Sequence, residues 1–201
     1  MQITRDALGR YTPRQLDLAP GQMSSAVLVP LYVESSRYHI LFTKRSDHVE
    51  HHKGQISFPG GAQDPDDPDL LHTALRETHE EIGVDPADVE VLGQLDDFVT
   101  ITNFRVRPYV GLIRRSPYEF IYNRHEVAEV LVVPVSHLVD DRNIAEELRQ
   151  VGERQVMMRS YVFEDHVIFG ATAFMLRAFL DLLAEEGSIE ELIREIAEEV
   201  R

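Results

Sequence analysis

One helix, with both of its ends marked in the sequence, lies between runs of strand-forming residues and restricts the chain to a few folds. Asp67 can accept hydrogen bonds from the free amides of a helix start, and Pro68 suits the first helical position, where no N–H is needed. Gly83 ends the pattern and Pro86 follows soon after it. A helix over 67–83 between strands predicts an α/β fold.

Strand-forming runs occupy most of the sequence on either side of this helix. The runs are residues 24–34, 38–45, 56–61, 89–101, 104–113, 126–135 and 154–170. The first two should form a hairpin, and the last should be a pair of strands around a turn. We therefore predict a mixed β-sheet flanked by helices.

A second packing helix is predicted after the last strands, from apolar residues at helical spacing. These are Ala171, Phe174, Met175, Ala178, Phe179 and Leu182. Ser188 and Glu191 form a capping-box pair that opens a charged helix over 187–201. Together with an N-terminal arm over 1–23, these elements predict one domain over 1–201.

The composition excludes several classes of protein. The net charge of −15 repels nucleic acid backbones, so a nucleic acid partner is not expected. The chain has no cysteine, which excludes disulfides and thiolate metal sites. No apolar run approaches a membrane span, and the first residues lack a signal pattern. We expect a cytoplasmic protein without a membrane partner.

Three glutamates crowd the end of the first helix. A helical wheel places them opposite an apolar stripe made of Leu71, Ala74, Leu75, Thr78 and Ile82. Glu77, Glu80 and Glu81 repel one another and lie near the negative end of the helix dipole. A solvated acidic face is one interpretation. A divalent cation such as Mg2+ or Mn2+ would turn this repulsion into shared coordination, and this is the interpretation we favour.

The segment RETHEEIGV, residues 76–84, resembles the second half of the Nudix box, G-x5-E-x7-R-E-U-x-E-E-x-G-U, where U is aliphatic. Thr78 replaces one aliphatic residue of that pattern. Gly61 lies one residue further from Arg76 than the pattern asks, and Pro68 stands at the position of the first glutamate. The resemblance implies a Nudix-like α/β/α sandwich and a hydrolase of nucleoside diphosphates linked to another moiety.

The longer spacing and an upstream pattern resemble the coenzyme A pyrophosphatase subgroup, whose signature is similar to L-L-T-x-R-S…G-x3-F-P-G-G. The matching residues here are Leu41, Thr43, Arg45, Ser46, Gly54, Phe58, Pro59, Gly60 and Gly61. The subgroup resemblance implies cleavage of coenzyme A or its derivatives to 4′-phosphopantetheine and adenosine 3′,5′-bisphosphate.

The family resemblance also implies roles for individual residues. Glu77, Glu80 and Glu81 would hold the metal, with Glu81 the principal ligand, and Arg76 would orient Glu77. A further carboxylate or imidazole should come from a distant loop, as a general base or as a further metal ligand. Glu126 is our first candidate. The alternatives are Glu129, Asp96 and Asp97.

Predicted substrate contacts lie upstream of the helix. Arg45 and Ser46 follow from the subgroup pattern, and the turn of Gly60 and Gly61 would bring backbone amides to the phosphates or the metal. Glu50 stands where the subgroup usually has a basic residue, so this chain should hold the 3′-phosphate differently or prefer another substrate.

Two other functions stay open. One is a Nudix pyrophosphatase for ADP-ribose or dinucleoside polyphosphates. The other is a non-catalytic module that binds a nucleotide and regulates a partner, although such a module has no need of a costly acid cluster. The arm over 1–23 or the helix over 187–201 could also serve a homodimer.

Overall fold

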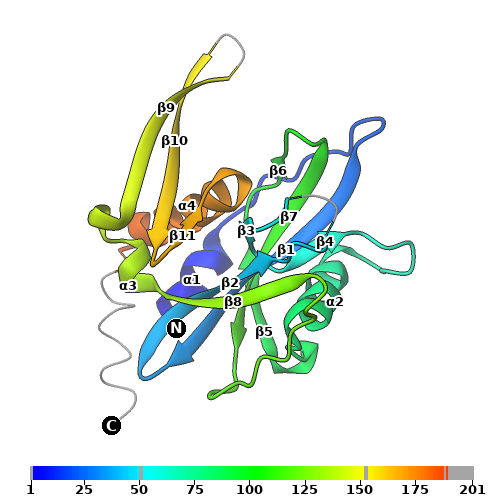
Figure 1. Cartoon of the computed structure of the whole chain (residues 1–201), viewed down its shortest axis with the longest axis vertical. Helices are drawn as coiled ribbons and strands as arrows, with labels where there is room; N and C mark the ends of the chain where they lie inside the picture. The colour runs from blue at the N-terminus through cyan, green and yellow to red at the C-terminus, as the bar shows by residue number, and fades with distance from the viewer. Residues whose placement is uncertain (1, 50–51, 152–153, 188, 190–201) are drawn as a thin grey trace.

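The computed structural model describes residues 2–49, 52–151, 154–187 and 189, and it shows a mixed sheet between helices (Figure 1). Four α-helices are described: α1 (Gln2–Arg10), α2 (Leu70–Ile82), α3 (Val135–Leu138) and α4 (Gly170–Glu185). The main sheet contains β1 (Met23–Glu34), β2 (Arg37–Arg45), β3 (Ile56–Ser57), β4 (Gly60–Ala62), β5 (Val89–Gln94), β6 (Phe98–Val99), β7 (Phe104–Ile113) and β8 (Val127–Pro134). A smaller sheet contains β9 (Ile144–Val151), β10 (Arg154–Phe163) and β11 (His166–Ile168).

The long strand β1 organises the main sheet. It runs parallel to β7 on one side and antiparallel to β2, its predicted hairpin partner, on the other. Near its start, over Ser25–Val27, β1 pairs instead with β4. Where β1 changes partner, the Leu28 amide donates to the Pro59 carbonyl at 2.9 Å. The sheet is therefore mixed, as predicted, and it divides at the turn that follows Phe58.

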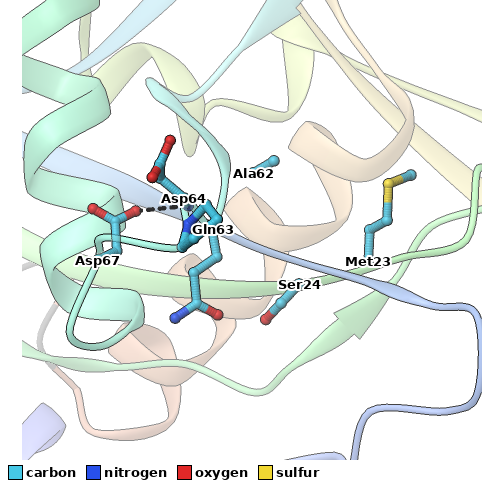
Figure 2. A pocket seen from close by; sticks show the side chains of 7 residues that line it. Met23, Ser24, Ala62, Gln63, Asp64 and Asp67 are labelled. Carbon is cyan, nitrogen blue, oxygen red and sulfur yellow. Dashed lines mark hydrogen bonds between the residues drawn. The ribbon is translucent and has the colours of Figure 1, made fainter.

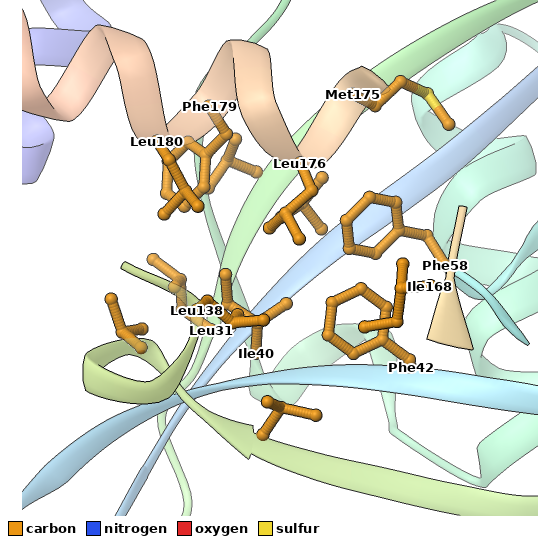
Figure 3. Close-up of a cluster of buried hydrophobic side chains, with 14 of the residues drawn as sticks. Leu31, Ile40, Phe42, Phe58, Leu138, Ile168, Met175, Leu176, Phe179 and Leu180 are labelled. Atoms are coloured by element: carbon orange, nitrogen blue, oxygen red, sulfur yellow. The ribbon is translucent and has the colours of Figure 1, made fainter. Parts of the chain in front are cut away.

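Alternation along β1 and β2 sends apolar side chains to both faces of the sheet. Leu31 and Phe42 point toward α4 and pack with Phe179 in the larger core (Figure 3). Their neighbours Tyr32 and Leu41 point the other way, into a cluster with Ile82 of α2. Helices thus cover both faces of the sheet, which confirms the predicted α/β fold.

The N-terminal arm packs against this body. Leu8 of α1 is 4% exposed and belongs to the same buried cluster as Val29 and Phe179. Arg5 donates two hydrogen bonds to Glu90 of β5, at 2.8 and 3.0 Å. The single domain over 1–201 stays a prediction, and this shared core supports it.

Two elements differ from the predicted ones. Strand β9 is not among the predicted strands; it pairs with β10 in a ribbon that projects from the body (Figure 1). In α4, Phe174 is 55% exposed and contacts Phe98 outside the predicted stripe. The predicted helix over 187–201 lies almost wholly outside the described residues. Of the helices that the structure describes, none is long and apolar enough to cross a membrane.

Candidate active site

The predicted start of α2 is wrong by two residues. The cap is Asp69, whose side chain accepts a hydrogen bond from the His72 amide, so Pro68 lies outside the helix. Asp67 cannot cap the helix because Arg76 and Thr73 occupy its carboxylate. The predicted end is confirmed.

Gly83 ends α2 in the left-handed conformation, at a φ of 74°. A side chain there would also meet the carbonyl oxygen of Ile121 at 2.6 Å. Glycine is therefore required both by the backbone conformation and by the close approach of the next loop.

The three glutamates do not share one solvated face. Glu80 is half exposed, but Glu77 is mostly covered and Glu81 is only 4% exposed. The helical wheel could not show the burial of Glu81, because strand β4 and the turn before it cover that side of the helix. The acids therefore extend from solvent into the protein interior.

The glycine turn lies directly against two of these carboxylates. The Gly60 amide donates to Glu81 Oε2 at 3.3 Å. A side chain on Gly60 would fall 2.3 Å from the Ala26 carbonyl oxygen, and one on Gly61 would fall 2.5 Å from Glu77 Cδ. Glycine at both positions is what lets the backbone reach the acids. Contact of these glycines with phosphate stays a prediction.

Arg76 joins the acids into one network. Its guanidinium donates to Glu77 Oε1 at 2.9 Å, which is the predicted orienting contact, and to Glu80 Oε2 at 3.0 Å. It also forms two 2.9 Å bonds with Asp67. The hydrogen bonds with Asp67 are the largest cause of the raised pKa of Arg76, and they hold the pKa of Asp67 well below its usual range. Sequence reasoning missed Asp67 as the partner of Arg76.

The environment of Glu81 disfavours its charged form. Burial is the main cause that raises its pKa to about 8, and the neighbouring charges of Glu77 and Glu126 raise it further. The hydrogen bond from the Gly60 amide and the charge of Arg45 act in the opposite direction and lower it. Burial likewise raises the pKa of Glu77 in spite of its bond with Arg76. Buried carboxylates in this state suit a divalent cation, which would favour ionisation.

The structure does not gather a complete set of metal ligands by itself. Within the described part of the chain, no group of three or more His, Asp or Glu side chains is close enough to hold a metal ion. Glu80, the third predicted ligand, is engaged by Arg76. The donors that fit a hard cation are Glu77 and Glu81, beside the amide of Gly60.

The loop before β8 brings Glu126 to the site. The Asn123 amide donates to the Glu81 carbonyl at 3.0 Å, and the Asn123 side chain donates to Glu126 Oε1 at 3.2 Å. The loop is thus fixed to the end of α2, and Glu126 is close enough to raise the pKa of both Glu77 and Glu81. The role of Glu126 as the base stays a prediction.

The other acids proposed as the base are engaged elsewhere. Asp96 accepts hydrogen bonds from Tyr11 and from the Arg14 amide, and Asp97 forms two 2.8 Å bonds with Arg107. Both hold the N-terminal arm or the sheet, which the sequence could not show. Glu129 lies on β8 beside Lys44 and His166.

Two predicted substrate residues follow β2. A bulge separates Lys44 from Arg45, and the charge of Arg45 lowers the pKa of Glu81. Ser46 is 3% exposed, and its hydroxyl donates to the His125 carbonyl. Its contact with substrate stays a prediction, since the structure gives it a contact within the protein. Glu50 lies outside the described residues.

A pocket opens between the start of β1 and the loop that follows β4 (Figure 2). Its volume is about 340 Å³, and it is lined by Met23, Ser24, Ala62, Gln63, Asp64, Pro65 and Asp67. Asp67 connects this pocket with the Arg76 network. None of the residues predicted to bind metal or substrate lines it.

Comparison with known proteins identifies the family. The model of the NUDIX domain matches residues 23–155. The chain belongs to the Nudix family. The Nudix fold is likewise seen in a MutT/nudix family protein from Enterococcus faecalis, with a TM-score of 0.56 at 14% identity, over 94% of this chain and 77% of that one.

Two similar Nudix relatives are both described as the uncharacterized Nudix hydrolase NudL. The one from Enterobacter sp. (strain 638) is 36% identical over 156 residues, which is 76% of this chain and 79% of the relative. The one from Yersinia enterocolitica is 35% identical over 164 residues, 79% of this chain and 83% of the relative. The chain is thus a Nudix hydrolase, an enzyme of the class that cleaves pyrophosphate bonds with divalent cations.

Proposed function

We propose that this Nudix hydrolase cleaves the pyrophosphate of coenzyme A or a closely related compound, with Mg2+ or Mn2+. The observation that carries the catalytic part of the proposal is the buried Glu81 carboxylate, whose pKa is raised and whose bond with the Gly60 amide is long, at 3.3 Å. Such a group is costly to bury unless a cation neutralises it.

Glu77 and Glu81 would hold the cation, and Glu80 would join them after leaving Arg76. When bound, the cation neutralises the pyrophosphate and makes a water molecule more acidic. Glu126 would take a proton from a water molecule, and the water oxygen would form a bond with one phosphorus. The bond from that phosphorus to the bridging oxygen would break, and the bridging oxygen would leave with the electron pair on the other phosphate. Arg76 holds Glu77 in place throughout.

The substrate class rests on the pattern around Arg45, Ser46 and the glycine turn, which resembles the coenzyme A pyrophosphatase subgroup. The products would be 4′-phosphopantetheine and adenosine 3′,5′-bisphosphate. Glu50, in place of a basic residue, favours a second candidate, a Nudix pyrophosphatase for ADP-ribose or dinucleoside polyphosphates. A cytoplasmic location and a homodimer are further predictions.

A substrate panel tests the proposal. Coenzyme A, dephospho-coenzyme A, ADP-ribose and a dinucleoside polyphosphate are incubated with Mg2+, Mn2+ or a chelator, and the products are separated. We expect metal-dependent release of 4′-phosphopantetheine from coenzyme A. Selective turnover of ADP-ribose would replace the substrate, and no turnover of any compound would favour the non-catalytic regulatory module.

A further inference from the structure

The loop that follows β2 and the loop that precedes β8 meet beside the candidate active site, and Ser46 joins them. The Ser46 amide donates to the Glu126 carbonyl at 2.8 Å, and its hydroxyl donates to the His125 carbonyl. The same hydroxyl oxygen accepts a hydrogen bond from the His48 amide at 3.2 Å. Ser46 therefore fixes the backbone of both loops with three hydrogen bonds, and at 3% exposure it is protected from water.

The junction holds two imidazoles side by side. The ring centroids of His48 and His125 lie 6.2 Å apart, with a tilt of 57° between the rings. Both residues are exposed. In the described part of the chain, no hydrogen bond or ion pair engages a ring nitrogen of either histidine. His52, in the same loop, differs because its ring bonds Gln55 at 2.9 Å.

The two histidines lie next to the predicted catalytic acids, but neither is a predicted metal ligand or base. His125 immediately precedes Glu126, whose charge reaches Glu77 and Glu81. Each imidazole carries at least one N–H donor in any tautomer, whereas carboxylates only accept. The protein has a net charge of −15, which repels anions. The imidazole N–H donors beside the acidic site are therefore the groups that an additional anionic group of the substrate can approach.

We infer that His48 and His125 together form a subsite for a phosphomonoester of the substrate, separate from the pyrophosphate that is cleaved. The inference rests on the proposed function for the position of the pyrophosphate, which would lie at Glu77 and Glu81. His125 adjoins Glu126 in the loop, and its ring faces His48 from the loop after β2, so the pair would hold a second phosphate of the same substrate. In coenzyme A that group is the 3′-phosphate.

Ser46 acts here as a positioning residue. It is buried and its hydrogen bonds are satisfied within the protein, so it does not need to touch substrate. A subsite built from the two loops also offers this chain a way to hold the 3′-phosphate without the basic residue that Glu50 replaces.

Selectivity between coenzyme A and dephospho-coenzyme A tests the inference, because the two differ only in the 3′-phosphate. For His48→Asn and His125→Asn we expect kcat/KM on coenzyme A to fall roughly tenfold more than on dephospho-coenzyme A, about the value of one charged hydrogen bond. The matched control is His72→Asn, whose ring bonds Asp69 on the exposed start of α2. A selectivity ratio equal to that of the unaltered enzyme in both variants would overturn the inference.

A binding experiment separates this inference from the proposed function. Imidazole NMR signals of the full chain with Mg2+, assigned with the same variants, are followed during titration with adenosine 3′,5′-bisphosphate or adenosine 5′-monophosphate. We expect both ring signals to move with the bisphosphate at concentrations where the monophosphate has little effect. Equal responses to the two nucleotides, or none, would refute the subsite even if coenzyme A is hydrolysed. A selective response would support it even if no turnover is found.

Discussion

Glu81 is the residue on which the catalytic proposal depends most. Its carboxylate is buried, lies beside Glu77 and touches the glycine turn through Gly60. Losing a group that only supports a metal ligand costs about 10–100-fold in activity or metal affinity. Replacing the ligand itself should cost more.

We therefore expect Glu81→Gln to lower kcat/KM by more than about 100-fold while the fold stays intact. In a chelator the variant should be at least as stable as the unaltered protein above pH 8, since the buried charge that burial disfavours is gone. Steady-state kinetics and thermal unfolding check both parts. Exposed Glu119→Gln is the matched control. An active Glu81→Gln enzyme would remove the metal hypothesis in its present form.

Asp67 holds Arg76 from the side opposite the glutamates. Without its two hydrogen bonds, Arg76 loses the contact that keeps its guanidinium in place for Glu77. For Asp67→Asn we predict a loss in kcat of about 10–100-fold, the range for removing a supporting partner of a metal ligand. Kinetics and the metal concentration for half activity measure it. Asp66→Asn, exposed on the same loop, should behave like the unaltered enzyme, and equal behaviour of the two variants would contradict the role of Asp67.

At the scale of the elements, the arm and the sheet meet at Asp97. This carboxylate accepts two bonds from Arg107 of β7 and one from the Leu16 amide. Burial alone would raise its pKa, but the bonds from Arg107 and Leu16 outweigh burial and hold the pKa below its usual 3.8. A carboxyl whose pKa is lower in the folded state stabilises the fold above its unfolded pKa.

The stabilisation by Asp97 should therefore be complete at pH 7 and disappear as the pH falls below about 4, through the lowered pKa. Removing one partner of a buried pair costs about 3–5 kcal/mol. We expect Asp97→Asn to lower the free energy of unfolding by about 3 kcal/mol at pH 7, with a smaller difference at pH 3. Urea unfolding at the two pH values measures this. A difference that is the same at both would show that the charge of Asp97 is not responsible.

The elements that the sequence predicted best are those marked by apolar runs and by glycine. The hairpin of β1 and β2 consists of two apolar runs separated by a short polar turn, and α2 ends at Gly83 as predicted. Strand β9 was missed because residues such as Glu146 and Glu147 replace the apolar alternation that marks a strand with one buried face.

At the scale of the whole molecule, contacts between distant segments explain what the sequence could not show. Asp96 and Asp97 resembled loop acids, yet residues 11–16 bind both of them. A helical wheel could not show that Glu81 is buried, because a wheel contains no neighbouring strand. Asp67 was predicted to cap α2, because the neighbouring sequence does not show that Arg76, nine positions away, donates two hydrogen bonds to its carboxylate.

The change of partner along β1 links correct folding to a working site. Strand β1 pairs with β2 over residues 31–34 and with β4 over residues 25–27. Between these two stretches, the Leu28 amide donates a hydrogen bond to the Pro59 carbonyl. A slip of one residue would turn every side chain of β1 to the wrong face, and it would also move Gly60 and Gly61 away from the carboxylates that they touch. A chain whose strands pair out of step therefore loses its core and its chemistry together, so that no misaligned form is expected to retain activity.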